Sequence, residues 1–139
     1  MESVVLDQLR ENGLTLAAAE YLTGGILATR MTALDPDLEV FRGSLVTALE
    51  EAEKAQMGDK RAAAAAQRAR AHFDTDIGIA TLAPGEMEDY PPGTVFLGIA
   101  MRGARKSRSV TLPGARSRMR SYAVISLLDY LRKTLAAEG

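Results

Sequence analysis

The sequence contains no cysteine and a single histidine among its 139 residues. The absence of cysteine excludes disulfides, zinc–thiolate sites and thiol nucleophiles. It also favours a cytoplasmic location, because disulfides mark the proteins of oxidising compartments. The one histidine, His72, has no second imidazole to support a metal site, so we expect it to have a structural role late in a helix. We expect no metal and no cofactor.

Long apolar runs and a strong charge of one sign are also absent. No stretch approaches the ~18 apolar residues of a membrane span. The first residues, MESVVLDQLREN, mix acidic with apolar side chains and lack the basic-then-apolar order of a signal peptide. The formal net charge of -1 gives no field that attracts a polyanion. We therefore expect neither a membrane nor a nucleic acid as partner.

The chain does have enough apolar residues, 47%, to form one core. Apolar periodicity and turn signals then divide it into elements. Strands that alternate with helices and end in a hairpin indicate an α/β fold, a three-layer α/β/α sandwich with a mixed sheet of about five strands, in one domain over residues 1–139. The expected helices are 3–12, 23–34, 50–56, 59–73 and a last one from just after Pro113-Gly114 to about 137, and the expected strands are 14–19, 44–49, 76–82, 94–101 and 106–112.

The stretch AAAEYLTGGILATRM is typical of a strand that turns into a helix over a ligand. Thr23 is expected to cap this helix, with Gly24 and Gly25 in its first turn. Their backbone N–H groups, at the positive end of the helix dipole, suit a phosphate or carboxylate. Glu20 would either orient that ligand or complement the dipole. Tyr21 is the unusual residue, because it puts a bulky phenol where such an elbow carries a small or nucleophilic side chain.

Four landmarks follow one another along the chain: a strand ending in Ala-Glu, a Thr-Gly-Gly helix start, a strand pair around PPGTVFLGIA, and PGARSRMR before the last helix. Together they resemble the C-terminal domain of the CinA family, over residues 4–135. The best-known activity of that family is the hydrolysis of nicotinamide mononucleotide to its nicotinate form with release of ammonia. The resemblance implies a five-stranded mixed α/β/α fold, a nicotinamide nucleotide ligand and a homodimer.

The catalytic positions of that family are replaced in this chain. Its first motif, Ala-Glu-Ser-Cys-Thr-Gly-Gly, contains the nucleophilic serine, and Tyr21 occupies that register. Its second motif supplies a tyrosine and a lysine, where this chain has Ala48 and Glu53, with Lys54 one residue later. Losing nucleophile and base together costs about 10⁶-fold in rate in such units. We therefore expect no catalytic residue to be intact.

The other two motifs of the resemblance concern binding. Pro84 and Gly85 keep the outline of a glycine-rich substrate loop, which is shortened here. PGARSRMR follows a Gly-Asp-Arg-x-x-Val-Arg pattern with Ala115 in place of the acid. The predicted ligand-binding residues are Glu20, Tyr21, Thr23, Gly24, Gly25, Pro84, Gly85, Arg116 and Arg120.

Charged residues gather in two parts of the sequence. The acids at 50–53 and 86–89 suit either a hard-cation site or solvated faces, and we favour solvated faces. The basic run suits a nucleotide phosphate, an acidic partner surface or solvent, and Arg116 and Arg120, four residues apart on one helix face, also suit a subunit interface. The basic run consists of Arg102, Arg105, Lys106, Arg108, Arg116, Arg118 and Arg120.

Three functions remain open from the sequence. The first is an inactive CinA-like domain kept for nucleotide binding or regulation, in which Tyr21 plugs the pocket or stacks on a ligand ring and Glu53 points outward. The second is an active amidohydrolase whose nucleophile is Thr23 or Ser44, with Lys54 reaching inward. The third is a structural dimerisation module. The first predicts nucleotide binding without turnover, the second predicts ammonia release, and the third predicts neither.

Overall fold

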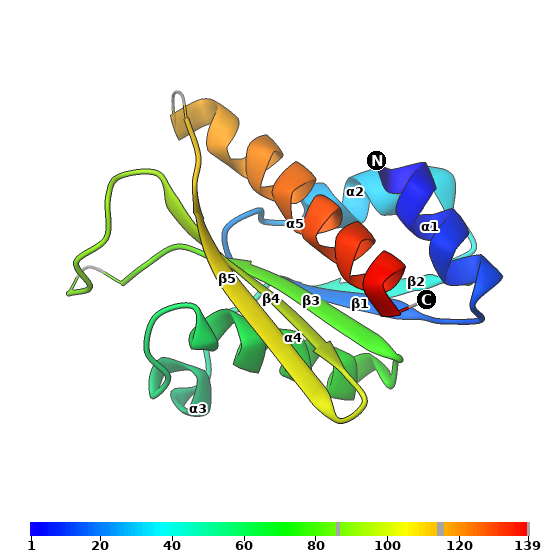
Figure 1. Ribbon diagram of the computed structural model, residues 1–139, viewed down its shortest axis with the longest axis horizontal. Helices are drawn as coiled ribbons and strands as arrows, with labels where there is room; N and C mark the ends of the chain where they lie inside the picture. The colour runs from blue at the N-terminus through cyan, green and yellow to red at the C-terminus, as the bar shows by residue number, and fades with distance from the viewer. Residues whose placement is uncertain (86, 114–115, 139) are drawn as a thin grey trace.

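Five strands form one mixed sheet in the order β2-β1-β3-β4-β5 (Figure 1). β1 (Leu16–Glu20) lies parallel to β2 (Phe41–Leu45) and to β3 (Ile77–Leu82). β4 (Thr94–Met101) and β5 (Ala104–Thr111) add to β3 as an antiparallel hairpin. The expected mixed sheet of five strands is thus confirmed.

The computed structural model describes residues 1–85, 87–113 and 116–138. Gly114 and Ala115 of the last motif lie outside the described residues, as does the side chain of Arg116. Among the described helices, none is long and apolar enough to cross a membrane.

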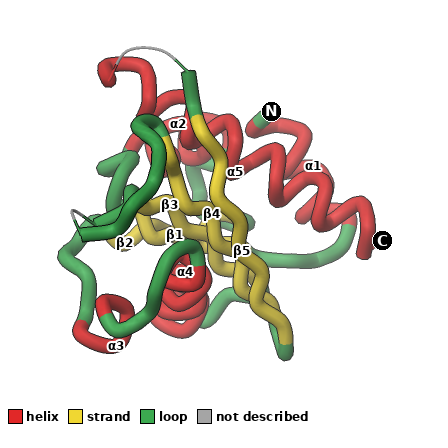
Figure 2. The backbone as a smooth tube through the Cα atoms, turned by 60° about the vertical axis from the view of Figure 1, so that its left-hand side comes forward, coloured by secondary structure: helices red, strands yellow, loops and turns green. Residues whose placement is uncertain are grey.

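Helices cover both faces of the sheet, so the molecule has three layers (Figures 1 and 2). One layer consists of α1 (Glu2–Glu11), α2 (Ile26–Leu34) and α5 (Arg116–Glu138), packed over the larger apolar cluster. The opposite layer contains α4 (Lys60–Phe73) and the short α3 (Glu51–Lys54). This arrangement is the predicted α/β/α sandwich.

The α4 helix packs very close to the sheet because both surfaces are built from small residues. A Cβ added at Gly78 would come within 3.0 Å of the Ala66 carbonyl oxygen, and one at Gly98 within 3.0 Å of the Ala62 carbonyl oxygen. The alanine run of α4 is therefore a packing surface. The buried alanines of this layer are Ala17, Ala19, Ala62, Ala65, Ala66, Ala69, Ala80 and Ala100.

Two element boundaries differ from the prediction near the elbow. The second strand is Phe41–Leu45 and not 44–49, because its partner β1 ends at Glu20 and leaves the following residues without a ladder, with Val46 exposed. The helix expected at 23–34 begins at Ile26, because Gly24 and Gly25 have φ of 57° and 105°, outside the helical region.

The predicted cap of α2 also needs correction, and the N-cap residue of α4 makes no side-chain bond. Thr23 is not the N-cap of α2. Gly25 takes that position and has no side chain with which to cap the helix. Asp59 does stand at the N-cap of α4, but its carboxylate makes no capping hydrogen bond. At the other end of the sheet, the last strand begins at Ala104, two residues before the predicted start, and ends at Thr111.

Candidate functional site

Tyr21 follows directly after β1, and two charged side chains enclose its hydroxyl. The phenol donates its proton to the carboxylate of Glu53, whose Oε2 and Oε1 lie 2.9 and 3.2 Å away. Nη1 of Arg68 donates to the phenol oxygen at 2.9 Å and lies 3.1 Å from Oε1 of Glu53. Tyr21, Glu53 and Arg68 thus form a closed set of contacts, here called the Tyr21 cluster.

Glu53 is directed inward by the local structure of α3. Glu50 and Glu53 form a capping box, in which the Glu50 backbone N–H donates to Glu53 Oε1 at 2.7 Å. The Glu53 side chain is only 4% exposed. The expectation that it would point outward is therefore wrong, because the capping box and Arg68 both hold it inside. Lys54 points outward instead and pairs with the exposed Glu51 at 3.5 Å.

The ring of Tyr21 packs against the alanine-rich layer beside α4. Burial raises the pKa of its hydroxyl to about 12, and the bond to Glu53 and its negative charge act in the same direction, while Arg68 opposes them. At neutral pH the phenol is therefore a proton donor and carries no charge. The same neighbours raise the pKa of Arg68 despite its burial, so its positive charge is permanent.

The raised pKa of Tyr21 predicts a pH-dependent stability. The folded state keeps the phenol proton up to about pH 12, whereas the unfolded state releases it near the ordinary value of 10.0. The stability that this proton contributes is complete below pH 10 and is lost as the pH rises toward 12. A difference titration at 295 nm, native protein minus Tyr21→Phe, should show one tyrosine ionising near 12. The same difference in urea should return to about 10. If Tyr21 of the native protein ionised near pH 10, its hydroxyl would not be buried and bonded as the Tyr21 cluster requires.

The N-terminus of α2 already holds an anion, and that anion is the chain's own Glu20. Its carboxylate accepts the backbone N–H of Leu27 at 2.8 Å and of Ala28 at 3.2 Å. It also accepts the hydroxyl of Thr23 at 2.7 Å, and Glu20 and Thr23 are both buried. Of the two expected roles for Glu20, complementing the helix dipole is therefore the one that these contacts show.

A cavity of about 880 Å³ opens beside the elbow, where Leu22 forms part of its wall. Leu22, Pro84, Gly85 and Arg120 line it, so three of the four sequence motifs meet there. The rest of its wall comes from the loop before β4, from Leu112 after β5 and from Met119. Tyr21 is absent from this lining. The structure thus brings Pro84 and Gly85 of the loop together with Arg120 of α5. The ring of Tyr21 packs instead in the layer of α4.

Glu88 fixes the loop that walls this cavity. Its carboxylate accepts the backbone N–H groups of Gly85 and Gly58, both at 2.9 Å, and Arg61 Nη1 at 2.6 Å. The Gly85 N–H lowers the pKa of Glu88 most, and Arg61 adds to the effect. Glu88 is therefore an internal tether and not a solvated acid. In the described part of the chain, no three His, Asp or Glu side chains are grouped as a metal site requires.

Arg68 is the functional residue that the sequence did not reveal. It lies on the alanine-rich helix α4, 47 residues from Tyr21 in the sequence. The one available signal was indirect: an acid at the position of an expected buried lysine calls for a cation nearby. That signal does not identify which arginine of the chain pairs with Glu53.

Comparison with known protein families identifies the family of this chain. The model of the CinA C-terminal domain matches residues 1–135. The chain belongs to the CinA C-terminal domain family. Known members of CinA-like proteins include one from Frankia casuarinae, 38% identical over 98% of this chain. A putative competence-damage inducible protein from Clostridium novyi is 31% identical over the whole chain. This CinA C-terminal domain spans 35% and 38% of those two relatives, about a third of their length.

Solved structures agree with the CinA fold. A CinA superfamily protein from Klebsiella pneumoniae superposes with a TM-score of 0.85 at 22% identity, covering 98% of this chain and 96% of that one. The competence/damage inducible protein CihA from Agrobacterium tumefaciens gives a TM-score of 0.78 at 20% identity, with 97% and 94% covered. At such identities these likenesses establish the fold of the CinA C-terminal domain.

Proposed function

We propose that this domain has lost the amidohydrolase chemistry associated with the resemblance and is retained to bind a nucleotide. The Tyr21 cluster carries the proposal. A serine amidase needs a nucleophile, a base that takes its proton, and donors for the oxyanion. Here the residue in the nucleophile register is a protonated phenol that donates to Glu53. Glu53, in the register of the base, is itself bound by Arg68.

The hydroxyls considered as substitute nucleophiles are not activated. Thr23 Oγ1 is buried, which keeps a substrate away from it, and Glu20, to which it donates, already accepts the backbone N–H groups of Leu27 and Ala28. Ser44 Oγ is buried and has no hydrogen-bond partner among the described residues. Lys54 faces outward, toward Glu51. These placements favour loss of chemistry over an amidohydrolase with an unusual nucleophile.

The cavity beside the elbow supports the binding half of the proposal. Its volume of about 880 Å³ is within the range of small-molecule sites. Leu22 and the prolines of the loop offer apolar wall for a ring, and Arg120 offers a cation for a phosphate. A nicotinamide nucleotide has both parts. The homodimer implied by the resemblance remains a prediction.

The test is to incubate the purified domain with nicotinamide mononucleotide and to follow ammonia and the acid product by mass spectrometry. We expect no product above a boiled control, together with saturable binding of the nucleotide by calorimetry. Arg120→Gln should weaken that binding about tenfold, because it removes the charged partner of the phosphate. Arg118→Gln is the matched control, since it removes the same charge from the same helix outside the cavity, and it should change binding less than about twofold.

Two results would overturn the proposal, and a third would overturn the assignment of the nucleotide to this cavity. Turnover well above the boiled control would show that a nucleophile survives. Failure of the folded protein to bind the nucleotide at all would leave the dimerisation module as the better reading. Equal weakening by Arg120→Gln and Arg118→Gln would place the nucleotide outside this cavity.

A further inference from the structure

The charges of the chain are divided unevenly along its length. Residues 91–139 contain nine Lys and Arg but only two Asp and Glu, whereas residues 1–90 contain eight and sixteen. The β4–β5 hairpin belongs to the basic part and carries Arg102, Arg105, Lys106 and Arg108. The near-neutral net charge therefore conceals a positive hairpin, whose field concentrates small anions around it.

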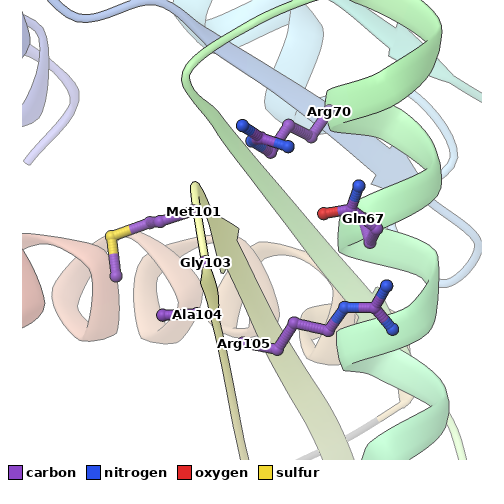
Figure 3. Close-up of a pocket in the computed structure, with 6 residues that line it drawn as sticks. All are labelled: Gln67, Arg70, Met101, Gly103, Ala104 and Arg105. Atoms are coloured by element: carbon purple, nitrogen blue, oxygen red, sulfur yellow. The ribbon is translucent and has the colours of Figure 1, made fainter.

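A second cavity, of about 320 Å³, lies between this hairpin and α4 (Figure 3). α4 contributes Gln67 and Arg70, and β5 contributes Arg105, so the cavity is lined on two sides by side chains with N–H donors. The hairpin turn at Gly103 closes it, and Met101 and Ala104 complete the lining. None of the described residues that line it is acidic.

The two arginines of this cavity keep their charge available. Nε of Arg70 donates to the backbone carbonyl of Asp76 at 3.0 Å, which orients the guanidinium without neutralising it. Neither Arg70 nor Arg105 takes part in an ion pair among the described residues. Arg61 and Arg68 on the same helix do pair with carboxylates. Arg70 thus differs from Arg61 and Arg68, the other two arginines of α4, and it shares with Arg105 the lack of an acidic partner in the part of the chain that the structure describes.

This cavity lies at the opposite end of the sheet from the elbow. Glu20, at the end of β1, pairs with Thr81 near the end of β3. The hairpin turn instead follows Met101, beyond the pairing of Gly78 with Ala100 at the start of β3. The separation makes a contact with both cavities by one small ligand impossible, so the two sites are distinct.

We infer that the cavity formed by Gln67, Arg70 and Arg105 binds a small phosphorylated molecule. Two guanidinium forks from opposite walls match a tetrahedral dianion, which offers oxygens on several sides, whereas one fork satisfies a carboxylate. The amide of Gln67 adds a further donor from the α4 wall. The volume leaves room for the group that carries the phosphate.

The experiment titrates the domain with pyrophosphate by calorimetry, at fixed ionic strength and without other phosphate. We expect one saturable site, weakened about tenfold by Arg105→Gln and by Arg70→Gln. Arg105→Gln is the decisive variant, because this exposed side chain makes no hydrogen bond among the described residues and its loss should leave the fold intact. Arg102→Gln is the matched control, since it removes one charge from the same hairpin without lining this cavity, and should change binding less than about twofold.

Three outcomes would overturn the inference. Equal weakening by Arg102→Gln would mean that only the field of the hairpin attracts the anion. Binding of citrate as tight as that of pyrophosphate would mean a general polyanion surface and not a phosphate site. Weakening by Arg120→Gln but not by Arg105→Gln would assign the pyrophosphate to the elbow cavity. The last variant also separates this inference from the proposed nucleotide site, because each can fail alone.

Discussion

Glu53→Ala is expected to destabilise the domain by about 3 kcal/mol, which lowers its melting temperature by about 10 °C. The Glu53 side chain is 4% exposed and that of Arg68 is 22% exposed. Removing the carboxylate leaves the guanidinium and the phenol of Tyr21 without their shared acceptor, since both are bound to it. Breaking a buried ion pair on one side costs about 3–5 kcal/mol. The partial exposure of Arg68 and its remaining ion pair with Glu50 Oε1, at 3.2 Å, put the effect at the lower end.

Glu51→Ala provides the matched control for this prediction. It removes the same side chain from the same short helix, but Glu51 is 93% exposed and pairs only with Lys54. Its expected cost is less than about 0.5 kcal/mol. Thermal and urea denaturation of Glu53→Ala, Arg68→Ala and the double variant should give a coupling of about 2 kcal/mol. If Glu53→Ala and Glu51→Ala were equally mild, the Tyr21 cluster would not be a structural unit.

The sequence predicted the sheet best where the pattern was local and unambiguous. The continuous apolar run TVFLGIAM matches β4 residue for residue, because turn residues bound it on both sides and every position but the last is buried. The β2 strand was placed too late along the chain. Its true extent depends on where β1 ends, and on the core position of Phe41, which no local pattern reports.

The sequence singled out residues of the candidate site but not the contacts between them. The resemblance identified Tyr21 and Glu53 as replaced catalytic residues, 32 residues apart. That the phenol bonds to this glutamate, and that Arg68 closes the cluster, depends on how α3 and α4 pack below β1. For Glu20 the sequence left two roles open, orienting a ligand or complementing the dipole of α2, and it could not decide between them for a similar reason. Glu20 lies six residues before Ile26, the first residue of α2. Its carboxylate reaches the N-terminus of α2 only because Gly24 and Gly25, both with positive φ, turn the chain back between them.

Gly98→Ala is expected to destabilise the domain by about 2 kcal/mol or more, with a fall of about 6–8 °C in melting temperature. Alanine restricts the unfolded chain and so contributes about 0.4–1 kcal/mol in favour of folding. The new Cβ would, however, come within 3.0 Å of backbone atoms of Ala62 and Ala63, and a backbone cannot rotate away as a side chain does. Overpacking of about 1–3 kcal/mol, at its upper end here, therefore outweighs the entropic gain.

Gly85→Ala distinguishes this clash from the general effect of replacing glycine. Its Cβ would meet only flexible side-chain ends, those of Glu88 at 3.4 Å and Arg61 at 3.8 Å, so the stability should change by less than about 0.5 kcal/mol. Gly78→Ala should resemble Gly98→Ala, since its Cβ would approach the Ala66 carbonyl one helical turn along α4. Once α4 has moved away from the sheet, one displacement relieves both clashes, so the double variant should lose less stability than the sum of the two. Strict additivity in urea denaturation would mean that each strand yields separately and that α4 stays in place.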